Sequence, residues 1–176
     1  TVYGLYVPPA PAEDGAPAAV ENLNASFTDN SLVGKVAFTA PTATYAGGTL
    51  SGQLSYYVMV GNDTLATGKT YPGAFVRETV TVPEGVTTFR VTTANEVGSS
   101  PENKVKVYVG NDEPTQVKDV NLAIDPETGV AKLTWSPVTT GINGGYIGNI
   151  TYNVVRYPDS TTVATGLAAT EFTENF

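Results

Sequence analysis

A hydrophobic pattern in this chain occurs twice along its length. Residues 20–24 return 97 positions later as residues 117–121, and residues 35–38 return at the same spacing as residues 132–135. Three further pairs match in the same order, with a drift of one residue: Gly47-Gly48 with Gly144-Gly145, Ser55-Tyr56 with Thr151-Tyr152, and Ala66-Thr67-Gly68 with Ala164-Thr165-Gly166. A period of this length exceeds that of a solenoid repeat and suits a self-contained domain. The repeat therefore predicts two copies of one small domain in tandem.

The composition favours an all-β fold class for both copies. Gly (18) and Pro (12) separate segments rich in Val and Thr, and no window has helical periodicity. Seven short strands are expected in the first copy, over residues 20–27, 32–38, 54–60, 64–67, 75–82, 87–95 and 104–109. Their even spacing predicts a β-sandwich over residues 18–110. The expected core residues are Phe38, Tyr56, Val58, Phe89 and Val91.

The second copy, residues 114–176, repeats the first five strands. Residues 1–8 are interpreted as a strand that resembles the last strand of a preceding domain, because residues 4–7 match residues 106–109. Residues 9–17 form a Pro-rich linker, and residues 111–113 form a second, short linker that predicts a restricted, end-to-end arrangement. The chain is therefore interpreted as a piece of a longer protein, in which the second copy is incomplete.

An open edge is expected in this second copy. The sixth and seventh strands would complete the sheet that holds the third strand, so Tyr152 and Val154 are expected to lose half of their cover. An unpaired edge recruits other strands. Another copy of the chain is expected to supply one by strand addition or exchange, with residues 2–7 as the best donor. Further residues after 176 are the alternative.

Several motifs occur in a fixed order along both copies. Pro17 and Pro114 precede the first strands, and the second strand of the later copy ends in Trp135-Ser136-Pro137, with Phe38 in the place of the Trp in the earlier copy. The third strands carry Tyr56-Tyr57-Val58 and Tyr152-Asn153-Val154. In this order the chain resembles tandem fibronectin type III domains, although Thr87 stands where the family carries a Tyr. The resemblance implies immunoglobulin-like β-sandwiches.

The Gly-Gly loops and residues 153–159 resemble fibronectin type III modules in large secreted or surface proteins of Gram-negative anaerobic bacteria. That resemblance implies an extracellular or cell-surface location, reached through a signal sequence outside this segment. It also implies a noncatalytic spacer or adhesion module whose partners are neighbouring domains of the same polypeptide. The alternative is a glycan- or protein-binding module that uses loop aromatics or a sheet edge.

The residue inventory argues against several other functions. The chain contains no His and no Cys, so it lacks thiol nucleophiles, imidazole bases and the ligands that zinc prefers. No catalytic constellation is found, and no enzyme activity, cofactor or metal is expected. The net charge of −8, from 17 acidic and 9 basic residues, argues against binding of nucleic acid. No apolar run is long enough to span a bilayer, so membrane insertion is not expected.

Two sets of candidate site residues remain. The aromatic rings of Tyr45, Tyr71, Tyr146 and Tyr157 lie in or beside loops, where they are candidates for ligand contact, with core or interdomain packing as the alternative. Thr64 and Ser160 follow Asp at matching turns and resemble the Asp-Ser/Thr acceptor sites for O-glycans in this group of bacteria, with turn chemistry as the alternative. The carboxylates of Asp63, Asp112 and Glu113 are expected to stabilise turns, the alternative at the hinge being a bridging calcium ion.

Overall fold

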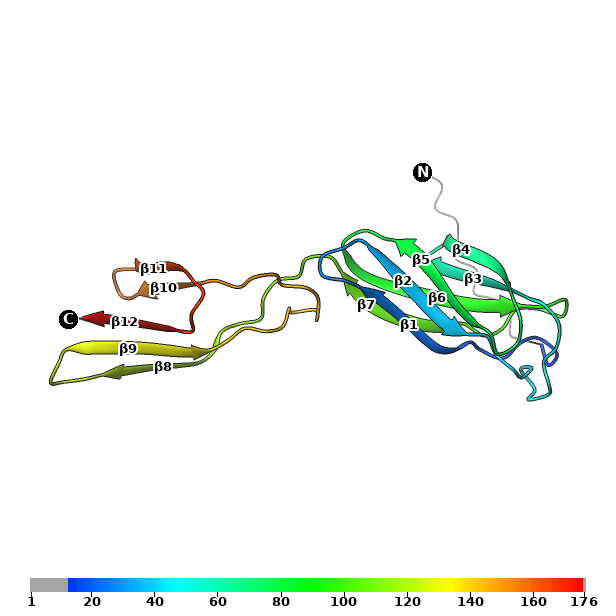
Figure 1. The fold of residues 1–176 in the computed structure, drawn as a ribbon, viewed down its shortest axis with the longest axis horizontal. Helices are drawn as coiled ribbons and strands as arrows, with labels where there is room; N and C mark the ends of the chain where they lie inside the picture. Colours follow the sequence, from blue (N-terminus) through cyan, green and yellow to red (C-terminus); the bar gives the residue numbers. More distant parts are fainter. Residues whose placement is uncertain (1–12, 176) are drawn as a thin grey trace. The chain divides into compact units, whose positions relative to one another are not determined.

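The computed structural model describes residues 13–175, which form two compact units divided between Gly110 and Asn111. We call them unit 1 and unit 2 (Figure 1). The expected strand over residues 1–8 and the first part of the linker over residues 9–17 lie outside the described residues.

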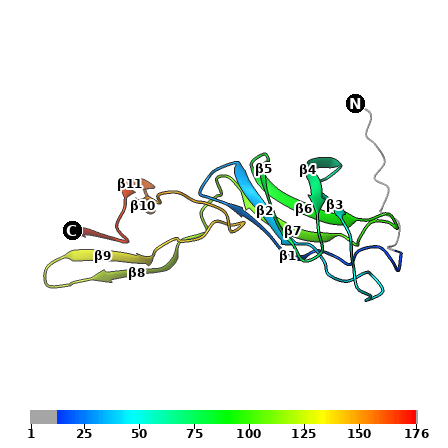
Figure 2. The same ribbon diagram turned by 45° about the vertical axis from the view of Figure 1, so that its right-hand side comes forward.

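Unit 1 contains the seven strands that the sequence predicts, with ends that differ by a few residues. They are β1 (Glu21–Phe27), β2 (Val33–Thr39), β3 (Leu54–Val60), β4 (Asp63–Thr70), β5 (Phe75–Thr81), β6 (Gly85–Ala94) and β7 (Asn103–Val109). One sheet has the order β1-β2-β5 and the other the order β4-β3-β6-β7, with antiparallel pairing throughout. Figures 1 and 2 show the two sheets face to face. The alternation of apolar and polar residues along each strand therefore produces a two-layer sandwich.

The core of unit 1 lies between these sheets, where the sequence places it. Phe38, Val58, Phe89 and Val91 are fully buried and Tyr56 nearly so, which confirms the predicted register. The Phe38 and Tyr56 rings meet edge to face, with centroids 5.7 Å apart. Thr87, at the position of the family's Tyr, is also buried.

The end of the expected linker before unit 1 packs on that unit. Ala16 is completely buried and its carbonyl accepts a hydrogen bond from the Tyr45 amide at 2.8 Å. The side-chain amide of Asn95 donates to the Gly15 carbonyl at 3.0 Å. Residues 13–17 therefore differ from the extended linker that their Pro-rich composition predicts, because loops distant in sequence bind their backbone groups.

Unit 2 contains five strands at the positions expected from the repeat. They are β8 (Lys118–Ile124), β9 (Val130–Ser136), β10 (Tyr152–Arg156), β11 (Thr161–Leu167) and β12 (Glu171–Asn175). Three of them form a sheet in the order β12-β9-β8, and β10 pairs with β11 in a second sheet. In Figures 1 and 2 the β10–β11 hairpin lies on the β12 side of the larger sheet, away from β8. The five strands thus reproduce the order of β1 to β5.

The repeat extends to details of the backbone and core. Isolated bridges join Pro17 to Thr44 in unit 1 and Pro114 to Gly141 in unit 2, at positions that the repeat spacing relates. The Trp135 and Tyr152 rings meet edge to face with centroids 5.3 Å apart, as Phe38 and Tyr56 do in unit 1. The two units are therefore copies at the level of packing as well as of sequence.

Candidate functional site

Two of the candidate tyrosines lie on neighbouring loops of unit 1. Tyr45 is 53% exposed in the loop between β2 and β3, and Tyr71 is 58% exposed directly after β4. The Ala40 backbone exchanges hydrogen bonds with Gly73 and Ala74, so the two loops run beside each other. Their exposed rings provide apolar, stackable surface at this end of the unit.

The two candidate tyrosines of unit 2 lie at opposite ends of β10. Tyr146 precedes this strand and is 38% exposed, whereas Tyr157 follows it and is 76% exposed. The backbone of Tyr146 is fixed, since its carbonyl accepts a hydrogen bond from the Asp112 amide at 2.7 Å. The structure therefore does not gather the tyrosines of unit 2 into one site.

Thr64 and Ser160 are both exposed, at the hairpins that join β3 to β4 and β10 to β11. Beside Ser160, the Thr161 side chain and backbone donate hydrogen bonds that hold the pKa of Asp159 below its ordinary value. Both hydroxyls are accessible, and they remain candidate O-glycan acceptors.

Asp112 closes the loop before β10 by accepting hydrogen bonds on both carboxylate oxygens. The Asn143 backbone and side-chain nitrogens lie at 2.8 and 2.9 Å, the Gly145 amide at 2.9 Å and the Glu113 amide at 2.8 Å. Desolvation opposes the effect of these donors, which nevertheless hold the pKa of Asp112 below its ordinary value. The carboxylate therefore has the turn-stabilising role that the sequence favours, on a loop that begins almost thirty residues further along the chain.

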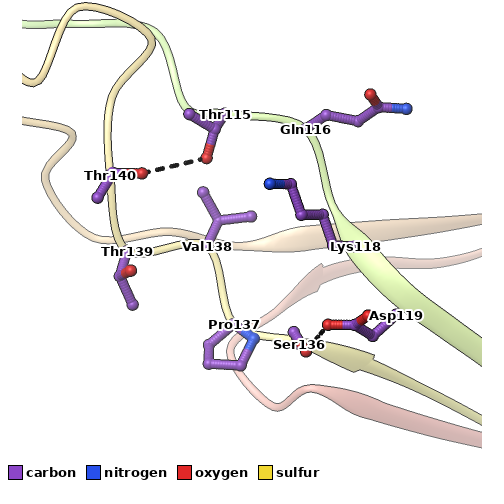
Figure 3. Close-up of a pocket in the computed structure, with 9 residues that line it drawn as sticks. All are labelled: Thr115, Gln116, Lys118, Asp119, Ser136, Pro137, Val138, Thr139 and Thr140. Carbon is purple, nitrogen blue, oxygen red and sulfur yellow. Dashed lines mark hydrogen bonds between the residues drawn. The ribbon is translucent and has the colours of Figure 1, made fainter.

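A small polar hollow lies at the start of β8, where residues 115–119 run beside residues 136–140 (Figure 3). Its volume is about 160 Å³. The Ser136 hydroxyl donates to Asp119 at 2.6 Å, and the Thr115 and Thr140 hydroxyls lie 3.4 Å apart. Figure 3 shows Lys118 on the same segment as Gln116 and Asp119, with its side chain directed toward Val138 of the facing segment. The two hydrogen-bonded pairs, Ser136 with Asp119 and Thr115 with Thr140, hold the two segments together.

A larger, apolar hollow runs along the open side of unit 2. Two connected stretches of about 280 and 240 Å³ share Leu133 and Val155 in their walls. The sequence predicts that Tyr152 and Val154 of β10 lose cover here, and Val154 is half-buried whereas its counterpart Val58 is fully buried. Tyr152 keeps its cover, at 8% exposed, because Trp135 packs against its ring and its hydroxyl accepts a hydrogen bond from the Val138 amide. Val155 of β10 is also exposed, and further exposed apolar side chains lie on β8, namely Val120, Leu122 and Ile124.

The strand order of unit 1 decides the architecture. A sheet of the first, second and fifth strands faces a sheet of the fourth, third, sixth and seventh strands. The fold is an immunoglobulin-like β-sandwich with the strand order of fibronectin type III domains. In unit 2 the five strands take the corresponding places, so the fibronectin type III order holds for its strands too.

Two arrays of fibronectin domains are among the solved structures to which this chain is similar. The FN1–FN3 domains of chicken CNTN1 are 11% identical, with a TM-score of 0.31, and the match covers 90% of this chain and 57% of that one. The central fibronectin-III array of RIM-binding protein is 18% identical, with a TM-score of 0.34, and the match covers 92% of this chain and 53% of that one. This chain thus spans little more than half of either structure. No family model matches it, and no curated protein does.

Two further searches concern the described residues alone. Residues 13–175 contain no group of three or more carboxylates placed to hold a metal ion. The same residues include no helix that is long and apolar enough to cross a membrane.

Proposed function

We propose that this chain is a noncatalytic spacer or adhesion module of a secreted or surface-attached bacterial multidomain protein. The observation that carries the proposal is the short segment that connects unit 1 to unit 2. Almost every residue of this segment is buried in, or hydrogen-bonded to, one of the two units. The bacterial and extracellular parts rest on the sequence resemblance described above.

The connection is fixed on both sides. β7 ends at Val109, which is completely buried in unit 1. Asn111 already forms a bridge with Tyr146 of unit 2, and the Glu113 carbonyl accepts a hydrogen bond from the Ile142 amide at 2.8 Å. Gly110 is thus the single residue between the last core residue of unit 1 and the first paired residue of unit 2. A tether of one residue limits how far apart the two attachment points can lie, which suits a spacer.

Spin labels provide a direct test, because the chain contains no Cys that would compete for labelling. Thr64→Cys and Ser160→Cys place one label on the exposed β3–β4 hairpin and one on the exposed β10–β11 hairpin. Pulsed electron resonance is expected to give a narrow distance distribution. Insertion of a Gly-Ser segment after Gly110 should broaden it. A distribution that is equally broad with and without the insertion would contradict the spacer role.

A second candidate function is the binding of a glycan or protein ligand by loop aromatics. The observation in its favour is the pair of exposed rings on the adjoining loops of unit 1, Tyr45 and Tyr71. A glycan array of the intact chain tests it, with Tyr45→Ala and Tyr71→Ala as variants and Tyr57→Ala as the matched control on a strand. A specific hit that the two loop variants lose would establish the binding function.

A further inference from the structure

The loop before β10 contains an Asn whose side chain is open to a reaction with its own backbone. Asn143 is the single Asn of the sequence that is followed by Gly, and it is exposed. Gly144 has a φ of 76°, and a Cβ added there would meet nothing within 4 Å. Asn is a labile residue over long times. A following Gly increases the lability, because no side chain hinders the approach of its backbone nitrogen.

The reaction is spontaneous deamidation. The Gly144 backbone nitrogen attacks Cγ of the Asn143 side chain, a C–N bond forms, and Nδ2 leaves as ammonia with the proton of the Gly144 amide. Water then opens the cyclic imide at either carbonyl and leaves Asp or isoaspartate at position 143. Both products place a carboxylate where the folded loop has an amide donor.

The folded loop holds back both reacting groups. The Asn143 side-chain nitrogen donates to Asp112 Oδ1 at 2.9 Å, and the Asn143 backbone nitrogen donates to Asp112 Oδ2 at 2.8 Å. The attacking nitrogen is also engaged, because the Gly144 amide donates to the Gly141 carbonyl at 3.0 Å. Ring closure requires these contacts to break, so it proceeds from a locally opened loop.

The product cannot restore the contact with Asp112. An ionised carboxylate only accepts hydrogen bonds, so a carboxylate at position 143 has nothing to donate to Asp112. Two carboxylates at hydrogen-bond distance also repel each other. The reacted loop therefore favours the opened form, and the anchoring of residues 111–113 on unit 2 is weakened.

Unit 1 has neither member of this pair. The repeat spacing relates Asp112 to Gly15 and Asn143 to Ala46. In unit 1 the Ala46 amide donates to the Asp14 carbonyl at 3.2 Å, so a backbone group accepts in place of the carboxylate. The susceptible pair is therefore specific to the loop that holds the connection to unit 2.

We propose that Asn143 is a site of spontaneous deamidation, that its contact with Asp112 slows the reaction while the loop is closed, and that the product prevents the contact from re-forming. A transient opening of the loop thus becomes permanent. The proposal concerns the chemistry of unit 2 and stands apart from the spacer role.

Peptide mapping by mass spectrometry of the intact chain measures the rate at neutral pH, with the chain unfolded in urea as the reference for an open loop. Asp112→Ala should deamidate at Asn143 about tenfold faster than the wild type, the effect of losing one charge-assisted hydrogen bond. Glu127→Ala, at an exposed carboxylate of the β8–β9 turn, is the matched control and should react at the wild-type rate. Asn149, exposed in the same loop but followed by Ile150, should stay intact in all three proteins. The proposal is overturned if Asp112→Ala reacts no faster than the wild type, or if the folded wild type reacts as fast as the chain in urea.

A second measurement concerns the product. Asn143→Asp should lower the melting temperature of unit 2, followed by Trp135 fluorescence, and speed amide exchange at Gly145. The deamidated wild-type chain, separated by its added negative charge, should behave in the same way. Asn149→Asp is the matched control, because it adds the same charge to the same loop away from Asp112. Equal effects of Asn143→Asp and Asn149→Asp would overturn the claim that the product disrupts this contact.

Discussion

Asp119 accepts a hydrogen bond from the Ser136 hydroxyl, with 2.6 Å between the two oxygens. In unit 1 the corresponding Asn22 side chain donates to the Thr39 hydroxyl at 3.4 Å. Asn22 and Asp119 both have positive φ, 53° and 55°, and each lies in a bulge of the first strand. Asn and Asp tolerate this left-handed conformation better than other residues with a Cβ. The repeated segments at residues 20–24 and 117–121 therefore encode a bulge as well as an apolar alternation.

We expect this backbone conformation to control the response of position 22 to substitution. Asn22→Val should destabilise unit 1 by about 1–2 kcal/mol, because a β-branched residue is unfavourable at positive φ. Asn22→Gly should change the free energy of unfolding much less, since Gly adopts this conformation readily. Chemical denaturation followed by circular dichroism measures both. Equal effects of the two substitutions would contradict the conformational explanation.

Phe38 is the second test, because it lies completely buried where the second copy carries Trp135. Phe38→Ala should lower the stability of unit 1 by about 3–5 kcal/mol through the cavity that it leaves. The matched control is Phe75→Ala, at a side chain that is 68% exposed. It should change the free energy of unfolding by no more than about 0.5 kcal/mol. Urea unfolding of the three proteins under one set of conditions measures the difference.

The strands and the core of unit 1 could be predicted from the sequence because period-two alternation fixes which face of each strand is buried. Phe38 and Val58 are examples. The interactions of Asp112 and Ala16 depend on loops that are distant in the sequence, and no local pattern identifies their partners. The sequence predicts exposure of both Tyr152 and Val154, since a neighbouring strand of the same sheet would cover them, and Val154 is half-buried but Tyr152 is not exposed. Trp135, on the opposite sheet, covers Tyr152 instead.

Tyr56 should make unit 1 sensitive to alkaline pH. A hydrogen bond to Glu78 on the opposite sheet, burial, and the negative charge of Glu78 raise the pKa of Tyr56 to about 12. A pKa raised by folding contributes stability that is fully present below the unfolded value of 10.0 and is lost as the pH rises through the folded value. Unit 1 should therefore lose stability across this window. In thermal melts, Tyr56→Phe should reduce the dependence of the melting temperature of unit 1 on pH. Tyr57→Phe, at a partly exposed ring, should leave that dependence unchanged.

Asp112 should make unit 2 sensitive to acid. Its pKa is lowered by folding, so its contribution is present above the ordinary value of 3.8 and is lost as the pH falls through the folded value. Asp112→Ala should lower the melting temperature of unit 2, as measured by Trp135 fluorescence, and speed amide exchange at Asn143 and Gly145. Glu127→Ala, at an exposed carboxylate in the β8–β9 turn, is the control for loss of one acidic residue. Unchanged exchange at Asn143 and Gly145 would show that the carboxylate does not hold this loop.

The anchoring of residues 111–115 has a mechanical consequence. Tension along the polypeptide enters unit 2 at Asn111, and it first loads the bonds to residues 140–146 rather than the β8–β9 ladder. The bonds of Asp112 and Pro114 to this loop therefore break before the β8–β9 ladder does. Under moderate tension the loop at residues 140–146 would detach and later re-form its bonds, while β8 and β9 stay paired.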